Sequence, residues 1–190
     1  MAAISCVKTV FLSGMILALA VASRPAQAQV TKPFKIQGQG VAPLGLPLPN
    51  QAARPHAIVG QATHLGRHTG QGTLKTTSVN FNLDGTVTGS FQSELPFKFV
   101  AANGDILVCH YGANSQGTYT LTPVNETGLF TARFVARFVP VSEQCTGRFY
   151  GVTGSWTMIA VTQPIQLGPS GFSDPIQYEW HGEGALTFKK

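Results

Sequence analysis

Residues 145–156 read Cys-Thr-Gly-Arg-Phe-Tyr-Gly-Val-Thr-Gly-Ser-Trp, a stretch that combines closely spaced glycines with bulky aromatic residues. Glycine lets the backbone reach positive φ and bend sharply. Phe149 and Tyr150 stand between two of these bends and offer aromatic faces that can close the end of a sheet. The stretch therefore predicts a glycine-jointed cap that leads directly into a strand. The bends are expected at Gly147, Gly151 and Gly154.

The strands around this cap alternate between two kinds of side chain. In residues 129–139 phenylalanine and alanine alternate with threonine, arginine and valine, and in residues 176–188 Tyr178 and Trp180 alternate with glutamate and histidine. A two-residue period of this kind is typical of a strand with one face in the core and the other toward water. Residues 155–163 show the same period directly after the cap.

Further strands are predicted at residues 56–63, 70–82, 86–101, 105–111 and 117–124. The pairs Asp84-Gly85 and Asn103-Gly104 are two-residue hairpin signals, so these strands are expected to form an antiparallel meander. No helical periodicity interrupts the pattern, and residues 164–175 are interpreted as a loop. About eight such strands favour an all-β, calycin-like closed antiparallel barrel, because closure removes exposed edges. A two-sheet sandwich is the alternative.

The N-terminus has the pattern of an export signal. Residues 1–28 contain a basic residue, an apolar run and a final Ala-Gln-Ala, which predicts cleavage between Ala28 and Gln29. No later stretch reaches the roughly 18 apolar residues of a membrane span. The mature chain is therefore expected to be secreted or periplasmic and not to span a membrane.

After the signal, the composition divides the chain into an arm and one domain. Residues 29–55 are rich in proline and glycine, and only residues 34–40 are predicted to form a first strand there. The rest of this segment is interpreted as an irregular arm. Residues 56–190 are expected to form a single barrel domain, since their length is enough for one full core.

Charge and cysteine content narrow the functional classes. The chain carries 13 Lys and Arg against 8 Asp and Glu, a formal net charge of +5, and loss of Lys8 and Arg24 with the signal would lower it to +3. So modest a charge excludes the basic footprint of a nucleic-acid-binding protein. Cleavage would also leave two of the three cysteines, Cys109 and Cys145. In an oxidising compartment this pair predicts a disulfide, with two separate buried thiols as the alternative.

Three motifs stand out in the sequence, Ala62-Thr63-His64-Leu65-Gly66, Ala101-Ala102-Asn103-Gly104-Asp105 and Thr146-Gly147-Arg148-Phe149-Tyr150-Gly151-Val152-Thr153-Gly154. Together they resemble those of a group of secreted bacterial proteins of unassigned function, whose barrel is similar to that of allene oxide cyclase and the dirigent proteins. The resemblance extends from residue 34 to the C-terminus, and Gly147-Arg148-Phe149 is its most specific part.

This resemblance implies an eight-stranded antiparallel barrel. In the plant relatives it also implies homotrimers and a cavity that guides cyclisation or coupling of a hydrophobic intermediate. It places no active-site residue at a numbered position of this chain. The long strand pair at residues 117–139 departs from the cyclase pattern, which leaves the oligomer interface open.

Two groups of polar residues are candidates for a site. Glu179, His181 and Glu183 share one face of the last predicted strand, with neighbours about 6.5 Å apart. If this face lined the barrel, a glutamate with a burial-raised pKa could transfer a proton, and the three are the catalytic candidates. A solvated outer face is the alternative. Arg133 and Arg137 also share a strand face and could clamp a carboxylate of a ligand, with surface placement again the alternative.

No metal or cofactor is expected. His64 and His68 have a spacing that suits metal binding on a helix, but on a strand they lie about 13 Å apart. The sequence also lacks the nucleophile elbow of serine hydrolases and the phosphate loop of nucleotide-binding proteins. Three functions stay open at this point. They are non-catalytic binding of a small hydrophobic ligand or a surface partner, a cyclase or isomerase acting inside the barrel, and a structural envelope protein with a filled barrel.

Overall fold

The computed structural model describes residues 28–42, 49, 52–112, 117–125, 128–168, 171–172 and 175–189. The predicted signal up to residue 27 and most of residues 43–51 lie outside this part. The described part is all-β, with one short 3₁₀ turn, η1 (Gly147–Phe149), and no α-helix. Its strands are β1 (Gln29–Ala42), β2 (Arg54–Ala62), β3 (Gly66–Phe81), β4 (Val87–Gln92), β5 (Phe97–Ala101), β6 (Ile106–Tyr111), β7 (Gly117–Pro123), β8 (Leu129–Pro140), β9 (Thr153–Thr162), β10 (Ile165–Gly168), β11 (Gly171–Phe172) and β12 (Ile176–Lys189).

Eight of these strands pair edge to edge into a closed antiparallel ring. The order around the ring is β1, β2, β3, β5, β6, β8, β9 and β12, and β12 pairs with β1 again. Every strand of the ring therefore has a neighbour on both sides, whereas the sheets of a sandwich would have open edges. The predicted antiparallel, barrel-like all-β arrangement is confirmed at this level.

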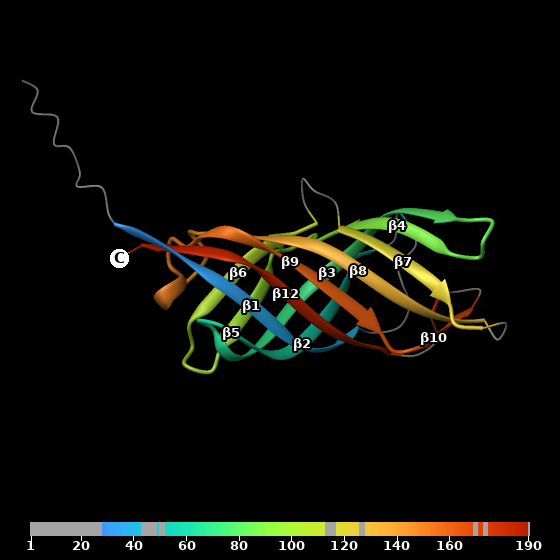
Figure 1. Cartoon of the computed structure of the whole chain (residues 1–190), viewed down its shortest axis with the longest axis horizontal. Helices are drawn as coiled ribbons and strands as arrows, with labels where there is room; N and C mark the ends of the chain where they lie inside the picture. The colour runs from blue at the N-terminus through green and yellow to red at the C-terminus, as the bar shows by residue number, and fades with distance from the viewer. Residues whose placement is uncertain are drawn as a thin grey trace, which may run out of the picture.

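Along one of its edges, each of the long strands β3 and β8 pairs with two different strands in succession. β3 pairs with β5 through its first half and with β4 further on, where the register shifts between Thr76 and Ser78. β8 pairs with β7 near its beginning and with β6 near its end. The β4–β7 pair thus extends the structure beyond the ring. Figure 1 shows this extension at one end and the C-terminus with η1 at the other.

Three strand predictions need correction. Residues 86–101 form two strands, β4 and β5, because the bend around Pro96 interrupts them. The first strand is longer than residues 34–40 and begins at Gln29. It tolerates Pro33, since pairing with β2 starts only at Ile36 and the missing N–H faces no partner strand. The loop predicted at residues 164–175 contains the short strands β10 and β11.

Aromatic side chains fill the interior that the eight strands enclose. Tyr111 stacks on Phe138 with 4.9 Å between ring centroids, and Phe138 stacks on Trp156 at 5.3 Å. Trp156 in turn contacts Phe34 at 4.8 Å. These four rings come from β6, β8, β9 and β1, and none of the four residues is more than 2% exposed. The core faces predicted for β8 and β12 are confirmed by the burial of Ala132, Ala136, Phe138, Ile176, Tyr178, Trp180 and Leu186.

The glycine-rich segment caps one end of this interior. Phe149 is completely buried, as predicted, whereas Tyr150 is 66% exposed and does not plug the end. Gly147 has a φ of 58°, and a side chain there would collide with the Asp105 carboxylate. The cap therefore needs glycine at this position both for its backbone and for the approach of the neighbouring turn.

Arg148 ties the cap to two turns that are distant in sequence. Its Nε donates to Asp105 Oδ2 at 3.0 Å, and its Nη1 donates to the His64 carbonyl oxygen at 3.1 Å. Asn103 also donates to the Asp105 carboxylate at 3.0 Å, and this hydrogen bond is the main reason that the pKa of Asp105 is lowered. One arginine thus brings together the three motifs that stand out in the sequence.

Candidate functional site

Glycines replace side chains on the inner face of β1 and β2. Gly38 pairs with Gly60, and the same row continues to Trp180 on β12 and His68 on β3. A Cβ on either glycine would lie 3.0 Å from the Trp180 ring. The two backbones therefore rest directly on the indole, and we attribute a hollow on the outer face of the sheet to this close approach.

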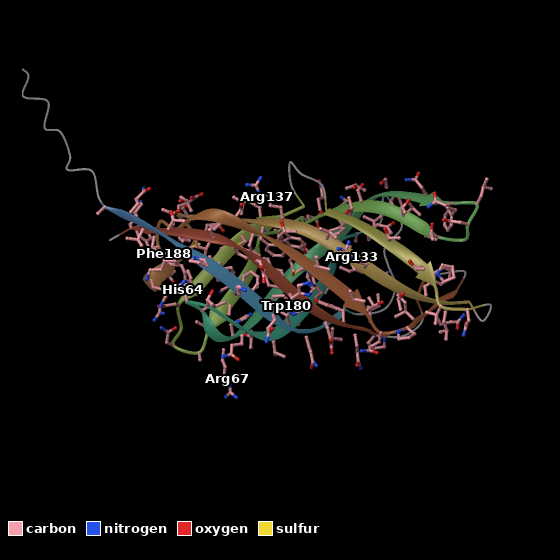
Figure 2. All side chains as sticks on the ribbon, in the orientation of Figure 1. His64, Arg67, Arg133, Arg137, Trp180 and Phe188 are labelled. Carbon is pink, nitrogen blue, oxygen red and sulfur yellow. The ribbon has the colours of Figure 1, made fainter. Side chains whose placement is uncertain are left out.

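The hollow has a volume of about 1000 Å³ and is lined mainly by outward-facing side chains of β9, β12, β1, β2 and β3. The two glycines and the inner residues Trp180 and His68 form its floor. Val59 and Val161, 58% and 44% exposed, are its apolar members. A groove of about 320 Å³ shares Gln39, Val59 and Glu179 with it and continues it along β1 and β12. Figure 2 shows Arg67 projecting away from the ribbon. The outward-facing polar side chains of this outer hollow are Gln37, Gln39, Gln61, Arg67, Glu179 and His181.

The register places these polar groups next to one another. Gln37 stands opposite both His181 and Gln61, and Gln39 stands opposite Glu179. Within the described part of the chain, none of the six side chains has a hydrogen bond or an ion pair with another residue. Their donors and acceptors are therefore free to meet a ligand.

The catalytic candidates from the sequence face outward. Glu179 and His181 lie in the outer hollow, while Glu183 forms an exposed ion pair with Lys35 at 3.4 Å. All three candidates are exposed, so none of them lines the inside of the ring of strands. Their positions match the alternative of a solvated outer face.

The two arginine candidates lie on the outer face of β8, both exposed. Arg137 donates from Nη2 to Ser155 Oγ at 3.0 Å, and Figure 2 shows its side chain directed away from the ribbon. Neither Arg133 nor Arg137 lines the outer hollow. The structure therefore places them on the surface, and the proposed carboxylate clamp stays a prediction.

A chain of polar side chains crosses the inside of the ring near the start of β2. His56 Nδ1 lies 2.8 Å from the Tyr178 hydroxyl, and His56 Nε2 lies 2.8 Å from the Tyr111 hydroxyl. Tyr111 donates its only hydroxyl proton to the Thr73 carbonyl oxygen. It must therefore accept from Nε2–H, which leaves Nδ1 as the acceptor for the Tyr178 hydroxyl.

The imidazole of His56 and the hydroxyl groups of Tyr111 and Tyr178 are all neutral near pH 7. Burial lowers the pKa of His56 to about 4, and it raises the pKa of Tyr111 and of Tyr178 above their usual range. A neutral imidazole with both nitrogens engaged links β12, β2 and β6. These hydrogen bonds orient the three side chains and satisfy their polar atoms inside an aromatic interior.

Cys109 and Cys145 are free, buried thiols in the structure. The Cys145 sulfur accepts from the Val108 N–H at 3.3 Å. Burial raises the pKa of both thiols, which makes them poor nucleophiles at neutral pH. The expected disulfide is not formed here, and the arrangement corresponds to the alternative of two separate thiols.

Several of these residues are not among those predicted from the sequence. The signal for the outer hollow is Gln-Gly-Gln-Gly at residues 37–40, which combines a polar outer face with an inner face that has no side chains. The signal for His56 is its parity with Ile58, a core residue two positions further along the same strand. His68 lies inside the ring of strands, where it donates from Nδ1 to the Gly66 carbonyl oxygen at 3.0 Å, whereas His64 donates from Nε2 to the Pro33 carbonyl oxygen at 3.2 Å.

In the part of the chain that the structure describes, no three His, Cys, Asp or Glu residues are grouped so that they could hold a metal ion. The same part contains no helix with the length and apolar character of a membrane span. In comparisons with known proteins, no family model matches the chain and no curated protein matches its sequence.

Proposed function

We propose that the protein is an exported, non-catalytic binding protein that holds a neutral, hydroxyl-rich ligand, such as an oligosaccharide, in the outer hollow. One observation carries this proposal. Six outward-facing polar side chains surround a hollow of about 1000 Å³, and none of these six has a partner within the described residues. Binding sites are concave and contain a few well-placed polar groups, and this hollow has both properties.

The side chains of the outer hollow favour an uncharged ligand with many hydroxyl groups. Each glutamine amide can donate and accept, as a pair of neighbouring hydroxyls can. Arg67 and Glu179 carry opposite charges, so neither an anion nor a cation is favoured overall. The exposed Val59 and Val161 supply apolar contact for the C–H groups of a sugar ring.

The backbone of the outer hollow disfavours an added peptide strand. A peptide that extends a sheet needs an unpaired strand edge. Through the hollow, β1 is paired with β12 and β2, and β12 is paired with β9 on its other side. Recognition here therefore depends on side chains, as for a saccharide.

A structural envelope protein is the second candidate, and the stacked interior favours it. Tyr111, Phe138, Trp156 and Phe34 occupy the space that a small hydrophobic ligand or a reacting intermediate would need in that section. The cyclase or isomerase alternative would depend on the buried His56 chain, whose members are neutral and already hydrogen-bonded to one another.

We also propose that the ring of strands belongs to the allene oxide cyclase and dirigent type of barrel and assembles as a homo-oligomer. The closed order of eight antiparallel strands supports the barrel type, and so does the Arg148 link between the three motifs. We further propose that the protein is exported to the periplasm or the medium, where the outer hollow would meet polysaccharides.

The test uses calorimetric titration with two soluble probes, cellohexaose and chitohexaose, and pull-down with insoluble peptidoglycan. We expect at least one probe to bind with a Kd of about 1 mM or tighter. The double variant Gln37→Ala/Gln61→Ala should weaken this binding at least about tenfold. Gln71→Ala is the matched control, because Gln71 is an exposed glutamine of β3 outside the hollow. Absence of binding to all three probes, or an equal loss in the control, would contradict the proposal.

A further inference from the structure

A second cleft lies at the capped end, beneath the ends of β1 and β12. These two strands pair from Gln29 and Lys189 onward, whereas β2 joins β1 only at Ile36, so the β1–β12 ribbon overhangs the cap. Figure 2 shows His64 and Phe188 at this end. The cleft, called the cap cleft below, has a volume of about 540 Å³ and is lined by Val30, Lys32, His64, Arg148, Phe188 and Lys189. A neighbouring hollow of about 410 Å³ shares His64 and Arg148 with it and adds Arg67 and Asn103.

Lys32 occupies an unusual position for a charged residue. It shares a strand face with Phe34 and Ile36, which are both buried. Its side chain therefore extends from the inner side of the ribbon, at the rim above the cap. Within the described residues Lys32 has no ion pair, and no carboxylate lines the cap cleft.

Of the other two cations, Arg148 is held in place by the cap and Lys189 lies against it. Arg148 uses Nε and Nη1 on Asp105 and on the His64 carbonyl, which leaves Nη2 without a partner in the described part. The Lys189 side chain passes close to Gly151, where a Cβ would lie 2.7 Å from its Cε, and its Nζ lies 5.9 Å from the centre of the Tyr150 ring. Fixed cations lose less conformational freedom when an anion binds.

The charge of the cap cleft matches a doubly charged anion. Lys32, Arg148 and Lys189 supply three positive charges, and Asp105, bound to Arg148, removes one of them. The remaining two positive charges correspond to a phosphate monoester, which carries about −1.5 to −2 at pH 7. A carboxylate would leave about one positive charge unpaired.

One wall of the cap cleft is apolar. Val30 and Phe188 stand directly opposite each other in the β1–β12 register. The Phe188 ring also contacts the His64 ring edge-on at 5.3 Å between centroids, which fixes its position. We therefore propose that the cap cleft binds a phosphate monoester that carries an apolar group, either a soluble organic phosphate or the headgroup of a lipid. This site is separate from the outer hollow, and either proposal can fail without the other.

The test measures binding of phenyl phosphate, inorganic phosphate and phenylacetate to the purified protein by calorimetry at low salt. We expect phenyl phosphate to bind with a Kd near 0.1 mM and the other two to bind at least about tenfold more weakly. Lys32→Gln and Lys189→Gln should each weaken phenyl phosphate binding about tenfold, since each removes a charged hydrogen bond. The matched control is Lys98→Gln, an exposed lysine of β5 outside the cleft, which should change the Kd less than twofold.

The apolar wall has its own variant. Val30→Thr keeps the shape of the side chain but replaces one methyl group with a hydroxyl, and it should reduce the preference for phenyl phosphate over inorganic phosphate. Equal affinities of wild type for the two phosphates would overturn the apolar part of the proposal. Equal losses in Lys32→Gln and Lys98→Gln would overturn the cap cleft as the site, and so would no binding at millimolar concentration.

Vesicles separate the two sources of the ligand. Vesicles of phosphatidylcholine with phosphatidic acid present the same monoester at a surface, and phosphatidylcholine alone is their control. Binding to the former that is lost in Lys32→Gln would assign the site to a lipid headgroup. Binding of phenyl phosphate without vesicle binding would assign it to a soluble phosphate. Vesicle binding that Lys98→Gln reduces as much as Lys32→Gln would contradict the proposal, because it would reflect overall charge alone.

Discussion

The inner and outer faces of β12, β1 and β2 place different constraints on the size of their side chains. Inside, Trp180 rests on Gly38 and Gly60, so the space for side chains is already taken. On the outer face, the pair Gln37 and Gln61 lies next to this pair of glycines, and neither glutamine has a hydrogen-bond or ion-pair partner among the described residues. The inner face should therefore be sensitive to small changes of volume, whereas the outer face should tolerate changes of side chain and lose only binding.

The largest effect is expected from a side chain on the inner face. Gly38→Val would place a Cβ 2.1 Å from the Val59 carbonyl oxygen and 2.7 Å from the Gly60 Cα, and these backbone atoms of β2 cannot move without breaking the β1–β2 pairing. The same Cβ would lie 3.0 Å from the Trp180 ring. We expect loss of the cooperative fold, or a destabilisation above about 4 kcal/mol. Circular dichroism and thermal unfolding would measure it.

Gln39→Val is the control for this variant, since it puts the same side chain on the next residue but on the outer face. Its free energy of unfolding should stay within about 1 kcal/mol of wild type. Similar losses in both variants would mean that strand pairing in β1, rather than contact with Trp180, sets the tolerance, and the contrast between the faces would disappear.

The next effect concerns the aromatic stack. Phe138 lies between Tyr111 and Trp156 and is fully buried, so Phe138→Ala should leave a cavity and cost about 3–5 kcal/mol in the free energy of unfolding. Urea denaturation would measure the loss. Val139→Ala on the outer face, where Val139 is 42% exposed, should cost less than about 1 kcal/mol. A cost below about 1 kcal/mol for Phe138→Ala would indicate a loosely filled interior and would favour a ligand inside the ring.

The alternation of side chains made the fold predictable. In β8 and β12 apolar residues recur at alternate positions of one face, and most of them are buried in the structure, while Phe130, Phe134 and Phe188 are partly buried. The split of residues 86–101 was harder to predict, because β4 and β5 both pair with β3 and only the bend at Pro96 separates them. The length of β1 was missed because Pro33 appeared to exclude a strand, although its N–H position has no partner strand.

The candidate site was less accessible from the sequence. The position of Glu179 and His181 on one strand face follows from alternation, but whether that face points in or out depends on ring closure. Gln61 and Arg67 reach the hollow only through the pairing of β1 with β2 and of β2 with β3. Contacts between distant segments of this kind have no local pattern in the sequence, and the hollow itself depends on the fit of Trp180 against two glycines.

A pH-dependent loss of stability would test whether His56 is buried and neutral inside the ring of strands. The pKa of His56 is about 4 in the folded protein and near 6.5 in an unfolded chain, so between these values the unfolded chain binds more protons. The free energy of unfolding should therefore fall as the pH is lowered from about 6.5 to about 4. His56 contributes at most about 3 kcal/mol to this fall. Burial also lowers the pKa of His68, which adds an effect of the same sign.

Urea denaturation at several pH values would measure this dependence. His56→Gln should flatten the curve, although it also disturbs the hydrogen bonds to Tyr111 and Tyr178 and lowers stability at pH 7. His110→Gln, the same substitution at an exposed position of β6, is the matched control. A slope that survives in His56→Gln would assign the effect to other groups, with His68 the first to examine.

The smallest effect is expected on the outer face. Gln37→Ala/Gln61→Ala removes two side chains that have no partner among the described residues, so the free energy of unfolding should change by less than about 0.5 kcal/mol. The same variant is expected to lose ligand binding, and this combination of unchanged stability with lost binding is what separates a site from a structural face. A destabilisation above about 1 kcal/mol would show that the glutamines support the sheet. The outer hollow would then be a by-product of packing Trp180 against Gly38 and Gly60, and this result would favour the second candidate function, a structural envelope protein.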